Sequence, residues 1–532
     1  MTRAVVSLLI VSVVIFALCT SSHGNGIPVT RWVSPDNSRP ITRAEWIAGR
    51  SIRTDPQIKI VPGFTGLATD FLIVVNTDLY PLISSDLTGY ISNLQNDGFS
   101  PSVITCDDVQ SLDACDSLKS ILAFYHLDGL QGAVFIGDLP IAWFHMLDDF
   151  DGDSVFEGYE EFPCDLYYMD LNGEWLDTLR WDWTDSLFLP GSDSILDVHR
   201  GEVIPEIWVG RLTPSPIGDE DSLLHEYFVR DSIYRCDSFP IPIRALAFVD
   251  DDWEWWAGEW SDNIRLTYPN VTTVADREST IADNYRDELS TGYEWISVFA
   301  HSWPGGHGFK YGMNQWSWFY AYEVPIVEPD ASFYNLFACS NARFVENGYM
   351  GGMYVFGREY GLGALGTTKT GSMLNFDEFY YPLGKGATIG EAFKDWFLTR
   401  GLDGYETWES SWFYGMTLLG DPTLKVRSAV GIEAEIHEVR SSPVMSLKAH
   451  PNPFKGVTTI HYILGGRNTE NAELSIYNAA GRAVKFIGLS SAKEYVSWDG
   501  KSNAGECLPS GVYFCRLQSD GETLTNNLIL IR

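Results

Sequence analysis

A histidine and a cysteine each follow an apolar segment directly in this sequence. His301 comes after the run WISVFA (295–300), and Cys339 comes after FYNLFA (333–338). A thiol is a weak nucleophile while protonated, whereas an imidazole within reach favours the thiolate and can protonate a leaving amine. The pair therefore indicates hydrolysis of an amide by a cysteine nucleophile. Taken singly, Cys339 fits a small buried core residue and His301 fits an imidazole satisfied by local backbone.

A second histidine, His307, lies in the sequence GGHG shortly after the first. Pro304, Gly305 and Gly306 turn the chain away from the apolar run before His307 is reached. We therefore predict that His301 is the catalytic base and that His307 belongs to a substrate-binding loop. The alternative is that His307 itself is the base.

Short apolar runs recur along the chain between segments of helical character. Continuous apolarity is typical of strands in a mostly parallel sheet that is covered by helices on both faces. A helix start is predicted at Thr388, where Glu391 completes a capping box. Functional side chains of such a sheet lie at its carboxyl edge, so adjacent strands would bring His301 and Cys339 together. The runs are FLIVV (71–75), GAVFIG (132–137), ALAFV (245–249), WISVFA (295–300), FYNLFA (333–338) and GALGTT (363–368).

One acidic segment, DDFDGDSVFEGYEE, has the spacing of a cation site. Asp149, Asp151 and Asp153 occupy alternate positions, as the oxygen ligands of calcium loops do. Ser154 stands where an EF-hand requires glycine, so the segment is not an EF-hand. These three residues are candidate ligands of a structural calcium ion, and the alternative is a solvated acidic loop. The hydrolytic chemistry itself requires no cofactor.

Further carboxylates follow the run ALAFV. Asp250, Asp251 and Asp252 come directly after it, and Asp262 lies in the next loop segment, GEWSDN. Because a strand end is predicted here, these acids are expected either to face the active cleft or to be solvated. Asp262 is therefore a candidate substrate-binding residue, together with His307.

The charge and the amino-terminal end of the chain restrict its partners and its compartment. The 532 residues include 36 basic and 71 acidic ones, a formal net charge of −35, which repels nucleic acid and anionic membranes. Arg3, the apolar run 4–17 and the small residues that follow predict a signal peptide over residues 1–24. No later segment is long and apolar enough to span a membrane, so we expect an exported chain without a transmembrane segment.

The cysteine count is odd once the signal peptide is removed. Seven cysteines follow Cys19, so an oxidising compartment allows up to three disulfides and leaves at least one thiol. Cys106 with Cys115, and Cys507 with Cys515, are close enough in sequence to pair, although spacing does not decide connectivity.

Near residue 430 the pattern changes to short alternating strands separated by turn residues. This predicts a linker over residues 431–447 and a small immunoglobulin-like β-sandwich over residues 448–532. The segments HPNPF, LSIYNAAGRAV, SWDGKSNAGECLPSGVYFCRL and LILIR closely resemble the C-terminal sorting domain of the type IX secretion system. The resemblance implies export through that machinery across the outer membrane of a Gram-negative-type bacterium, followed by release or surface attachment. The alternative is a purely structural sandwich.

The larger part of the chain, about residues 70–427, resembles the gingipain family of caspase-like cysteine peptidases. The resemblance lies in the two strand-end loops and in FIGDLP, CDLYYMDLNG, PEIWVGRL and LLGDPTLKV, which occur in the order that the family shows. It implies that His301 is the general base and acid, that Cys339 is the nucleophile, and that the backbone N–H groups of Cys339 and Ser302 hold the oxyanion. The family usually has Gly-His-Gly, whereas this chain has Ala300 and Ser302 around the histidine.

The sequence thus predicts a signal peptide (1–24), an α/β caspase-like peptidase region (25–430), a linker (431–447) and a β-sandwich sorting domain (448–532). The expected function is a secreted cysteine endopeptidase with a Cys-His dyad that acts on protein or peptide substrates. One alternative is an inactive caspase-like surface binding protein. A third class, an exported glycoside hydrolase, has no carboxylate pair singled out by spacing.

Overall fold

A computed structural model describes most of the chain. The chain splits into two compact units, residues 1–432 and 433–532. The predicted signal peptide lies outside the described residues. The structure describes residues 27–29, 32–50, 56–62, 69–312, 314–357, 359–427, 445–450, 454–455, 458–464, 472–478, 482–487, 489, 495–519 and 522–530.

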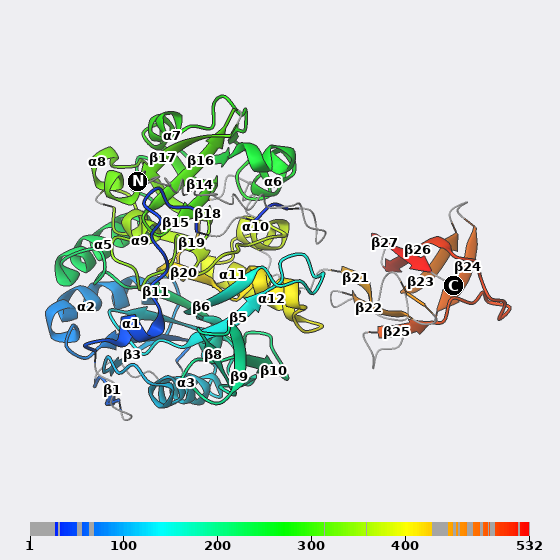
Figure 1. The fold of residues 1–532 in the computed structure, drawn as a ribbon, viewed down its shortest axis with the longest axis horizontal. Coiled ribbons are helices and arrows are strands. Elements are labelled where there is room, and N and C mark those ends of the chain that lie inside the picture. Colours follow the sequence, from blue (N-terminus) through cyan, green and yellow to red (C-terminus); the bar gives the residue numbers. More distant parts are fainter. Residues whose placement is uncertain are drawn as a thin grey trace, which may run out of the picture. The chain divides into compact units, whose positions relative to one another are not determined.

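The first unit is built on one eleven-stranded sheet (Figure 1). Most neighbouring strands are parallel, while the edge strand β1 is antiparallel to β3 and β20 is antiparallel to β19. In spatial order the strands are β1 (Ile58–Ile60), β3 (Pro101–Cys106), β2 (Phe71–Asn76), β4 (Gly132–Ile136), β11 (Trp208–Leu212), β20 (Met416–Gly420), β19 (Gly363–Thr367), β18 (Ala331–Phe337), β14 (Tyr293–Phe299), β12 (Ala245–Val249) and β13 (Val271–Val274).

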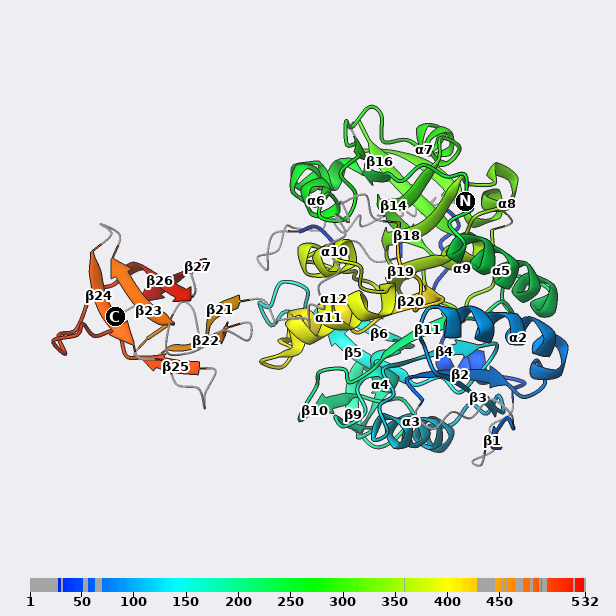
Figure 2. The same cartoon turned by 180° about the vertical axis from the view of Figure 1, so that it is seen from behind.

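Helices cover both faces of this sheet, which explains why its central strands are continuously apolar. Helices α2 and α5 pack against each other on one side, and α6, α10 and α11 pack together on the other (Figures 1 and 2). The helices are α1 (Arg43–Ile47), α2 (Tyr80–Asn96), α3 (Leu112–His126), α4 (Leu166–Met169), α5 (Glu220–Arg235), α6 (Ala257–Ile264), α7 (Ala282–Leu289), α8 (Val324–Val327), α9 (Met350–Val355), α10 (Asp377–Gly384), α11 (Ile389–Gly401) and α12 (Thr407–Phe413), with 3₁₀ turns η1 (Asp251–Trp256) and η2 (Ala321–Glu323).

The strands predicted from the six apolar runs are confirmed as β2, β4, β12, β14, β18 and β19. Every residue of β14 and of β18 is buried, as expected for strands that carry helices on both faces. The predicted capping box is also confirmed, because the Thr388 side chain accepts from the Glu391 N–H and the Glu391 carboxylate accepts from the Thr388 N–H. A mixed α/β fold with a large, mostly parallel sheet is therefore established for this unit.

Small antiparallel sheets lie in the connections of the large one. A three-stranded sheet, β15 (His301–Trp303), β16 (Gly306–Tyr311) and β17 (Gln315–Tyr320), occupies the connection from β14 to β18. Three hairpin-like pairs lie between β4 and β11. They are β5 (Trp143–Asp148) with β6 (Gly158–Pro163), β7 (Glu174–Leu176) with β10 (Val198–Arg200), and β8 (Leu179–Asp182) with β9 (Leu187–Pro190).

The second unit contains two antiparallel sheets around one core. The core includes Ile460, Leu474, Trp498 and Cys515, which come from strands of both sheets. A small all-β unit is thus present, while its likeness to an immunoglobulin domain stays a prediction. One sheet has β21 (Met445–His450), β22 (Thr458–Leu464) and β25 (Tyr495–Trp498), and the other has β24 (Ala483–Ile487), β23 (Glu473–Asn478), β26 (Gly511–Ser519) and β27 (Glu522–Leu530).

No disulfide joins the seven cysteines that the structure describes. Both pairings suggested by sequence proximity are therefore absent from it. Among the described residues, no helix combines the length and the apolarity required to cross a membrane.

Candidate active site

The ends of two neighbouring parallel strands bring His301 and Cys339 together. Strands β14 and β18 pair in register, with Phe299 opposite Phe337, and the Ala300 N–H donates to the Phe337 carbonyl at 3.1 Å. Both His301 and Cys339 lie two residues beyond these paired phenylalanines. Adjacent strands are about 4.8 Å apart, so the register places the two residues close together. The same small pocket is lined by both residues.

The imidazole of His301 is buried and held in one orientation. Its Nε2 lies 2.8 Å from an Asp252 carboxylate oxygen, and its ring packs against Trp253 and Trp316 at centroid distances of 4.7 and 5.1 Å. Because an ionised carboxylate only accepts hydrogen bonds, Nε2 carries the proton in the neutral ring. The buried Nδ1 has no hydrogen-bond partner among the described residues. Nδ1 is therefore the nitrogen that is available to take a proton from a neighbouring group.

Two carboxylates at the end of β12 differ sharply in their electrostatics. Burial raises the pKa of Asp250 to about 7. Burial acts in the same direction on Asp252, but hydrogen bonds from His301 and Lys310 outweigh it and lower the pKa to about 2. The Asp252 side chain, which also forms an ion pair with Lys310, is thus ionised at neutral pH and supplies a counter-charge for a protonated His301.

The turn after Cys339 presents its side chain at the strand end. Ser340, the next residue, adopts a left-handed backbone with φ of 60°, and its N–H donates to the Lys369 carbonyl at 2.8 Å. A non-glycine residue in this region costs on the order of 1 kcal/mol, which the surrounding structure must offset. Cys339 is partly exposed, whereas burial raises the pKa of the Cys106 and Cys115 thiols to about 12.

Ser302 connects the histidine turn to the cysteine turn. Its hydroxyl donates to the Cys339 carbonyl at 2.7 Å, and its own carbonyl accepts from the Val33 N–H at 2.9 Å. Ser302 is fully buried in β15, directly after His301. The oxyanion role predicted for the N–H groups of Ser302 and Cys339 stays a prediction.

An amino-terminal segment, of which residues 27–29 and 32–42 are described, covers this strand edge. Pro28 and Val29 line the pocket that holds His301 and Cys339, and the Pro28 carbonyl accepts from the Trp253 indole at 3.0 Å. With them in place the pocket has a volume of only about 10 Å³, room for at most a single water molecule. A peptide can reach the thiol only if this part of the segment moves.

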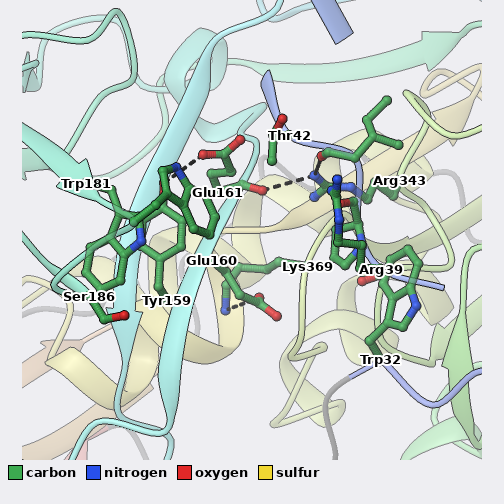
Figure 3. A pocket seen from close by; sticks show the side chains of 14 residues that line it. Trp32, Arg39, Thr42, Tyr159, Glu160, Glu161, Trp181, Ser186, Arg343 and Lys369 are labelled. Atoms are coloured by element: carbon green, nitrogen blue, oxygen red, sulfur yellow. Dashed lines mark hydrogen bonds and ion pairs between the residues drawn. The ribbon is translucent and has the colours of Figure 1, made fainter. Parts of the chain in front are cut away.

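A larger cavity of about 570 Å³ begins beside Cys339, since the next residue, Ser340, forms part of its wall. Figure 3 shows this cavity with other lining side chains, among them Tyr159, Trp181 and Glu160. Tyr159 and Trp181 stack on each other there with ring centroids 4.2 Å apart. Glu160 and Glu161 follow Tyr159 along β6 and also line the cavity, as do residues of the amino-terminal segment. The complete lining is Trp32, Arg39, Pro40, Ile41, Thr42, Tyr159, Glu160, Glu161, Trp181, Trp183, Ser186, Ser340, Arg343 and Lys369.

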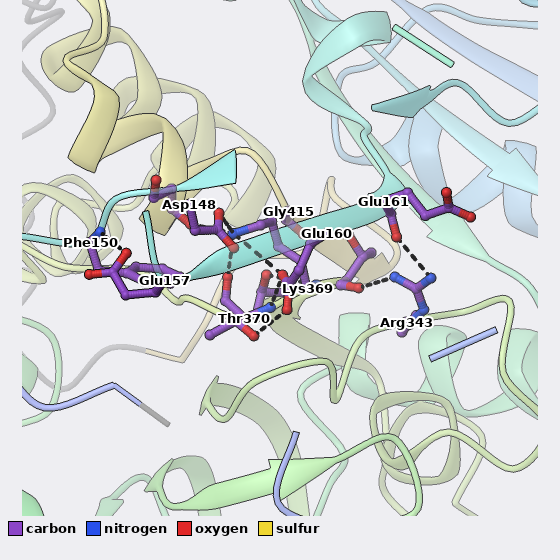
Figure 4. A network of polar contacts seen from close by, with 12 residues as sticks. Asp148, Phe150, Glu157, Glu160, Glu161, Arg343, Lys369, Thr370 and Gly415 are labelled. Carbon is purple, nitrogen blue, oxygen red and sulfur yellow. Dashed lines mark hydrogen bonds and ion pairs between the residues drawn. The ribbon is translucent and has the colours of Figure 1, made fainter. Parts of the chain in front are cut away.

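Buried cations fix the β6 wall of the cavity to the active-site turns (Figure 4). Lys369, which follows β19, pairs with Asp148 at 2.7 Å and with Glu160 at 3.6 Å. Arg343 donates to the carbonyl oxygens of Thr368 and Glu161 at 2.7 and 3.0 Å. Strand β6, which carries the aromatic and acidic lining residues, is thus joined to the segments that follow β18 and β19.

His307 and Asp262, the two predicted substrate-binding residues, lie elsewhere. His307 is fully buried in β16, with Nε2 3.1 Å from the Tyr354 hydroxyl, and burial lowers its pKa to about 3. Asp262 is exposed on α6 and pairs with Arg265 at 2.6 Å. Neither residue lines the cavities described above, and a role for them in substrate binding stays a prediction.

Two groups of side chains have ligand atoms close enough to hold a cation. The first is Asp250, Asp252 and His301, whose ligand atoms lie within 4.8 Å of one another. The Asp250 carboxylate already accepts from the Lys310 and Asp252 N–H groups, and Asp252 is paired with Lys310. The carboxylate oxygens of Asp250 and Asp252 are thus already hydrogen-bonded or ion-paired within the protein. The second group is Asp149, Asp151 and Asp153, the predicted calcium ligands.

The sequence did not single out Asp252 as the partner of His301. The only signal was its place in an acidic triplet after a strand, which did not distinguish it from Asp250 and Asp251. Lys310, Lys369 and the amino-terminal segment carried no signal at all, because each reaches the site through contacts that are distant in sequence.

Comparison with known families accounts for the C-terminal unit. Residues 448–531 match the family described as "Secretion system C-terminal sorting domain". This segment is a secretion sorting domain. The predicted resemblance to a sorting domain is confirmed over residues 448–531, and the sorting domain identifies the chain as exported, either surface-bound or secreted. Interaction with the secretion machinery follows from it.

Solved structures similar to the chain include a gingipain. The arginine-specific cysteine proteinase gingipain R is 13% identical, with a TM-score of 0.46 over 87% of this chain and 98% of that one. A complex of the pro- and mature domains of RgpB from Porphyromonas gingivalis is also 13% identical, with a TM-score of 0.45 over 87% of this chain and 100% of that one. Dimeric latent PorU from the same organism matches 22% of this chain and 11% of its own at 20% identity, with a TM-score of 0.16. No curated protein sequence matches the chain.

Proposed function

We propose that the chain is an exported cysteine endopeptidase in which Cys339 is the nucleophile, His301 transfers the proton and Asp252 orients His301. One arrangement carries this proposal. A partly exposed thiol and a buried imidazole follow adjacent strands in register, and a carboxylate holds the imidazole so that its Nδ1 is unused. Such a set provides a nucleophile, its base and the group that orients the base.

The reaction follows from these roles. The Cys339 sulfur attacks the carbonyl carbon of the substrate while its proton passes to Nδ1 of His301, and Asp252 balances the charge of the resulting imidazolium. His301 then gives that proton to the leaving amine, which departs and leaves a thioester on Cys339. A water molecule, deprotonated by His301, hydrolyses the thioester and restores the thiol.

Backbone donors next to both residues complete the proposed site. The donors proposed for the oxyanion are the N–H groups of Cys339 and of Ser302, the residue that follows the base. The bond from the Ser302 hydroxyl to the Cys339 carbonyl joins the two turns. The 570 Å³ cavity next to Ser340 is of a size that accepts substrate side chains. Pro28 and Val29 have to leave the thiol before a peptide binds.

The second candidate is an inactive surface protein that uses the cavity only for binding. Ala300 and Ser302 around the histidine and the filled pocket at Cys339 favour it. A glycoside hydrolase gains no support at this site, since both Asp250 and Asp252 are bonded to protein donors.

Labelling with a peptidyl acyloxymethyl ketone, followed by mass spectrometry, tests the proposal. Such a reagent requires a nucleophilic thiol in a peptide-binding site, so it should modify Cys339 and no other cysteine. Cys339→Ala and His301→Ala should abolish labelling, while Cys236→Ala, which removes an exposed thiol, should not. Cleavage of a peptide library should be lost in the same two variants. Folded protein that neither labels nor cleaves, even after residues 27–34 are cut away, would support the binding function instead.

A further inference from the structure

The hairpin that forms one wall of the cavity carries an acidic loop at its tip. The loop connects β5 to β6 and contains Asp149, Asp151 and Asp153, each of which offers a carboxylate oxygen within 4.8 Å of the others. We propose that these three carboxylates bind one calcium ion, which fixes the β5–β6 hairpin. Binding of the ion does not depend on the peptidase activity proposed above.

The burial of Asp149 is the observation that points to a ligand. Only 3% of this residue is exposed, and its Oδ1 has no hydrogen-bond partner among the described residues. Its other oxygen accepts only a 3.2 Å bond from the Ser154 N–H. An unpaired buried carboxylate costs several kcal/mol, which pairing with a cation offsets.

No basic side chain among the described residues forms an ion pair with Asp149. The closest candidate along the network is Lys369, but its ammonium group pairs with Asp148 and Glu160 and donates to the Thr370 and Ser411 carbonyls. A bound cation would supply the positive charge that Asp149 lacks among the described residues.

The surroundings favour calcium over a smaller cation. Asp151 and Asp153 are partly or fully exposed, so water can complete the coordination shell. Glu157 lies at the far end of the loop, where its carboxylate accepts from the Phe150 N–H at 3.1 Å. Calcium accepts six to eight oxygens in irregular geometry, whereas magnesium demands a near-ideal octahedron.

The loop is also connected to the candidate active site. The Asp149 N–H donates to the Ser411 hydroxyl at 2.9 Å, and the Trp412 indole donates to the Phe150 carbonyl at 3.2 Å. Trp412 lines the pocket around His301 and Cys339, and Tyr159 and Glu160 of β6 line the larger cavity. An ion at the loop would therefore hold both the aromatic wall and the helix α12 that packs behind the thiol.

Calcium titration of the purified full-length chain, stripped of metal with a chelator, tests this site. Calorimetry should detect one ion with a dissociation constant at or below about 1 mM, the weak end for extracellular sites, and the thermal midpoint should rise with calcium. Magnesium at the same concentration should raise the midpoint less. Asp151→Asn should weaken calcium binding by roughly tenfold or more, since it removes one charged ligand. Asp149→Asn should do so too, and Asp128→Asn, an exposed acid outside the loop, should bind calcium as the wild type does.

Two results would overturn the proposal. One is the absence of heat and of any midpoint change up to about 10 mM calcium, well above the weakest extracellular affinities. The other is wild-type calcium affinity in Asp151→Asn, which would place the ion elsewhere. Asp151→Asn decides the question even if Asp149→Asn fails to fold. Because heat and midpoint need no turnover, an inactive protein would leave this inference standing.

Discussion

Replacement of Asp252 by asparagine tests whether this carboxylate orients His301. The change keeps the size of the side chain but removes the charge that faces Nε2 at 2.8 Å. An asparagine amide can donate to Nε2, which would reverse the tautomer and place the proton on Nδ1. In that tautomer, Nδ1 no longer accepts the thiol proton. We therefore expect Asp252→Asn to lower kcat/KM while the protein stays folded.

The expected decrease in kcat/KM for Asp252→Asn has a lower and an upper bound. The pKa of Asp252 falls from 3.8 to about 2, and this shift corresponds to roughly 2.5 kcal/mol, shared between His301 and Lys310. If half of it belongs to the imidazole, the electrostatic share alone is about tenfold in rate. A fully reversed tautomer is worth up to about 10⁴-fold.

Steady-state cleavage of the best library peptide is the assay, with circular dichroism as the check on folding. Asp262→Asn is the matched control, because Asp262 is an exposed acid that pairs only with Arg265 and should leave kcat/KM within twofold. A folded Asp252→Asn protein with nearly wild-type kcat/KM would refute the orienting role. A large loss in Asp262→Asn would show that the α6 carboxylate, which the sequence suggested as a substrate contact, matters after all.

Three further predictions concern buried groups and the covering segment. Asp250 has a raised pKa of about 7, so its ionisation costs stability as pH rises from about 4 to 7, and Asp250→Asn should flatten that part of the curve of thermal midpoint against pH. His307 has a lowered pKa of about 3, so the unfolded chain binds its proton first and stability falls as pH drops from about 6.5 toward 3. Since glutamine does not titrate, His307→Gln should reduce that loss of stability at acid pH without abolishing peptide cleavage. A complete loss of cleavage in the folded variant would instead indicate that His307 is the base. A specific protease site inserted at the exposed turn around Pro35 and Asp36 should, once cut, increase peptide cleavage and labelling of Cys339, and unchanged rates after complete cutting would mean that the segment does not block the site.

The sequence predicted the strands of the fold well because their signal is local. WISVFA and FYNLFA are continuous apolar runs, and such runs become fully buried strands wherever helices cover both faces of a sheet. The choice of His301 over His307 also rested on local evidence, namely the Pro-Gly-Gly turn between them. In the structure that turn connects β15 to β16, and β16 places His307 in the core.

The rest of the site depends on contacts that no local pattern encodes. Asp252 belongs to a run of three acids in a chain rich in acids, and only the 3₁₀ turn η1 decides which one faces His301. The placement of Pro28 on Trp253 joins segments more than two hundred residues apart. The calcium hypothesis rested on the spacing of three aspartates alone. The burial of Asp149 was not visible in the sequence, because it follows from how the hairpin packs on α12.

The attachment of the amino-terminal segment to the rest of the chain has a consequence for competition at the thiol. The segment is held at its carboxyl end by α1, where Arg43 donates its N–H to Glu161 and the Ile41 carbonyl accepts from Arg343. A short tether of this kind keeps Pro28 and Val29 at an effective concentration of roughly millimolar near the site they cover. A substrate present at micromolar concentration would then lose to Pro28 and Val29 even if it bound more tightly by two orders of magnitude. A single cut in the tether would turn the same residues into an ordinary dilute peptide, so one covalent event can change occupancy of the site without altering any contact in it.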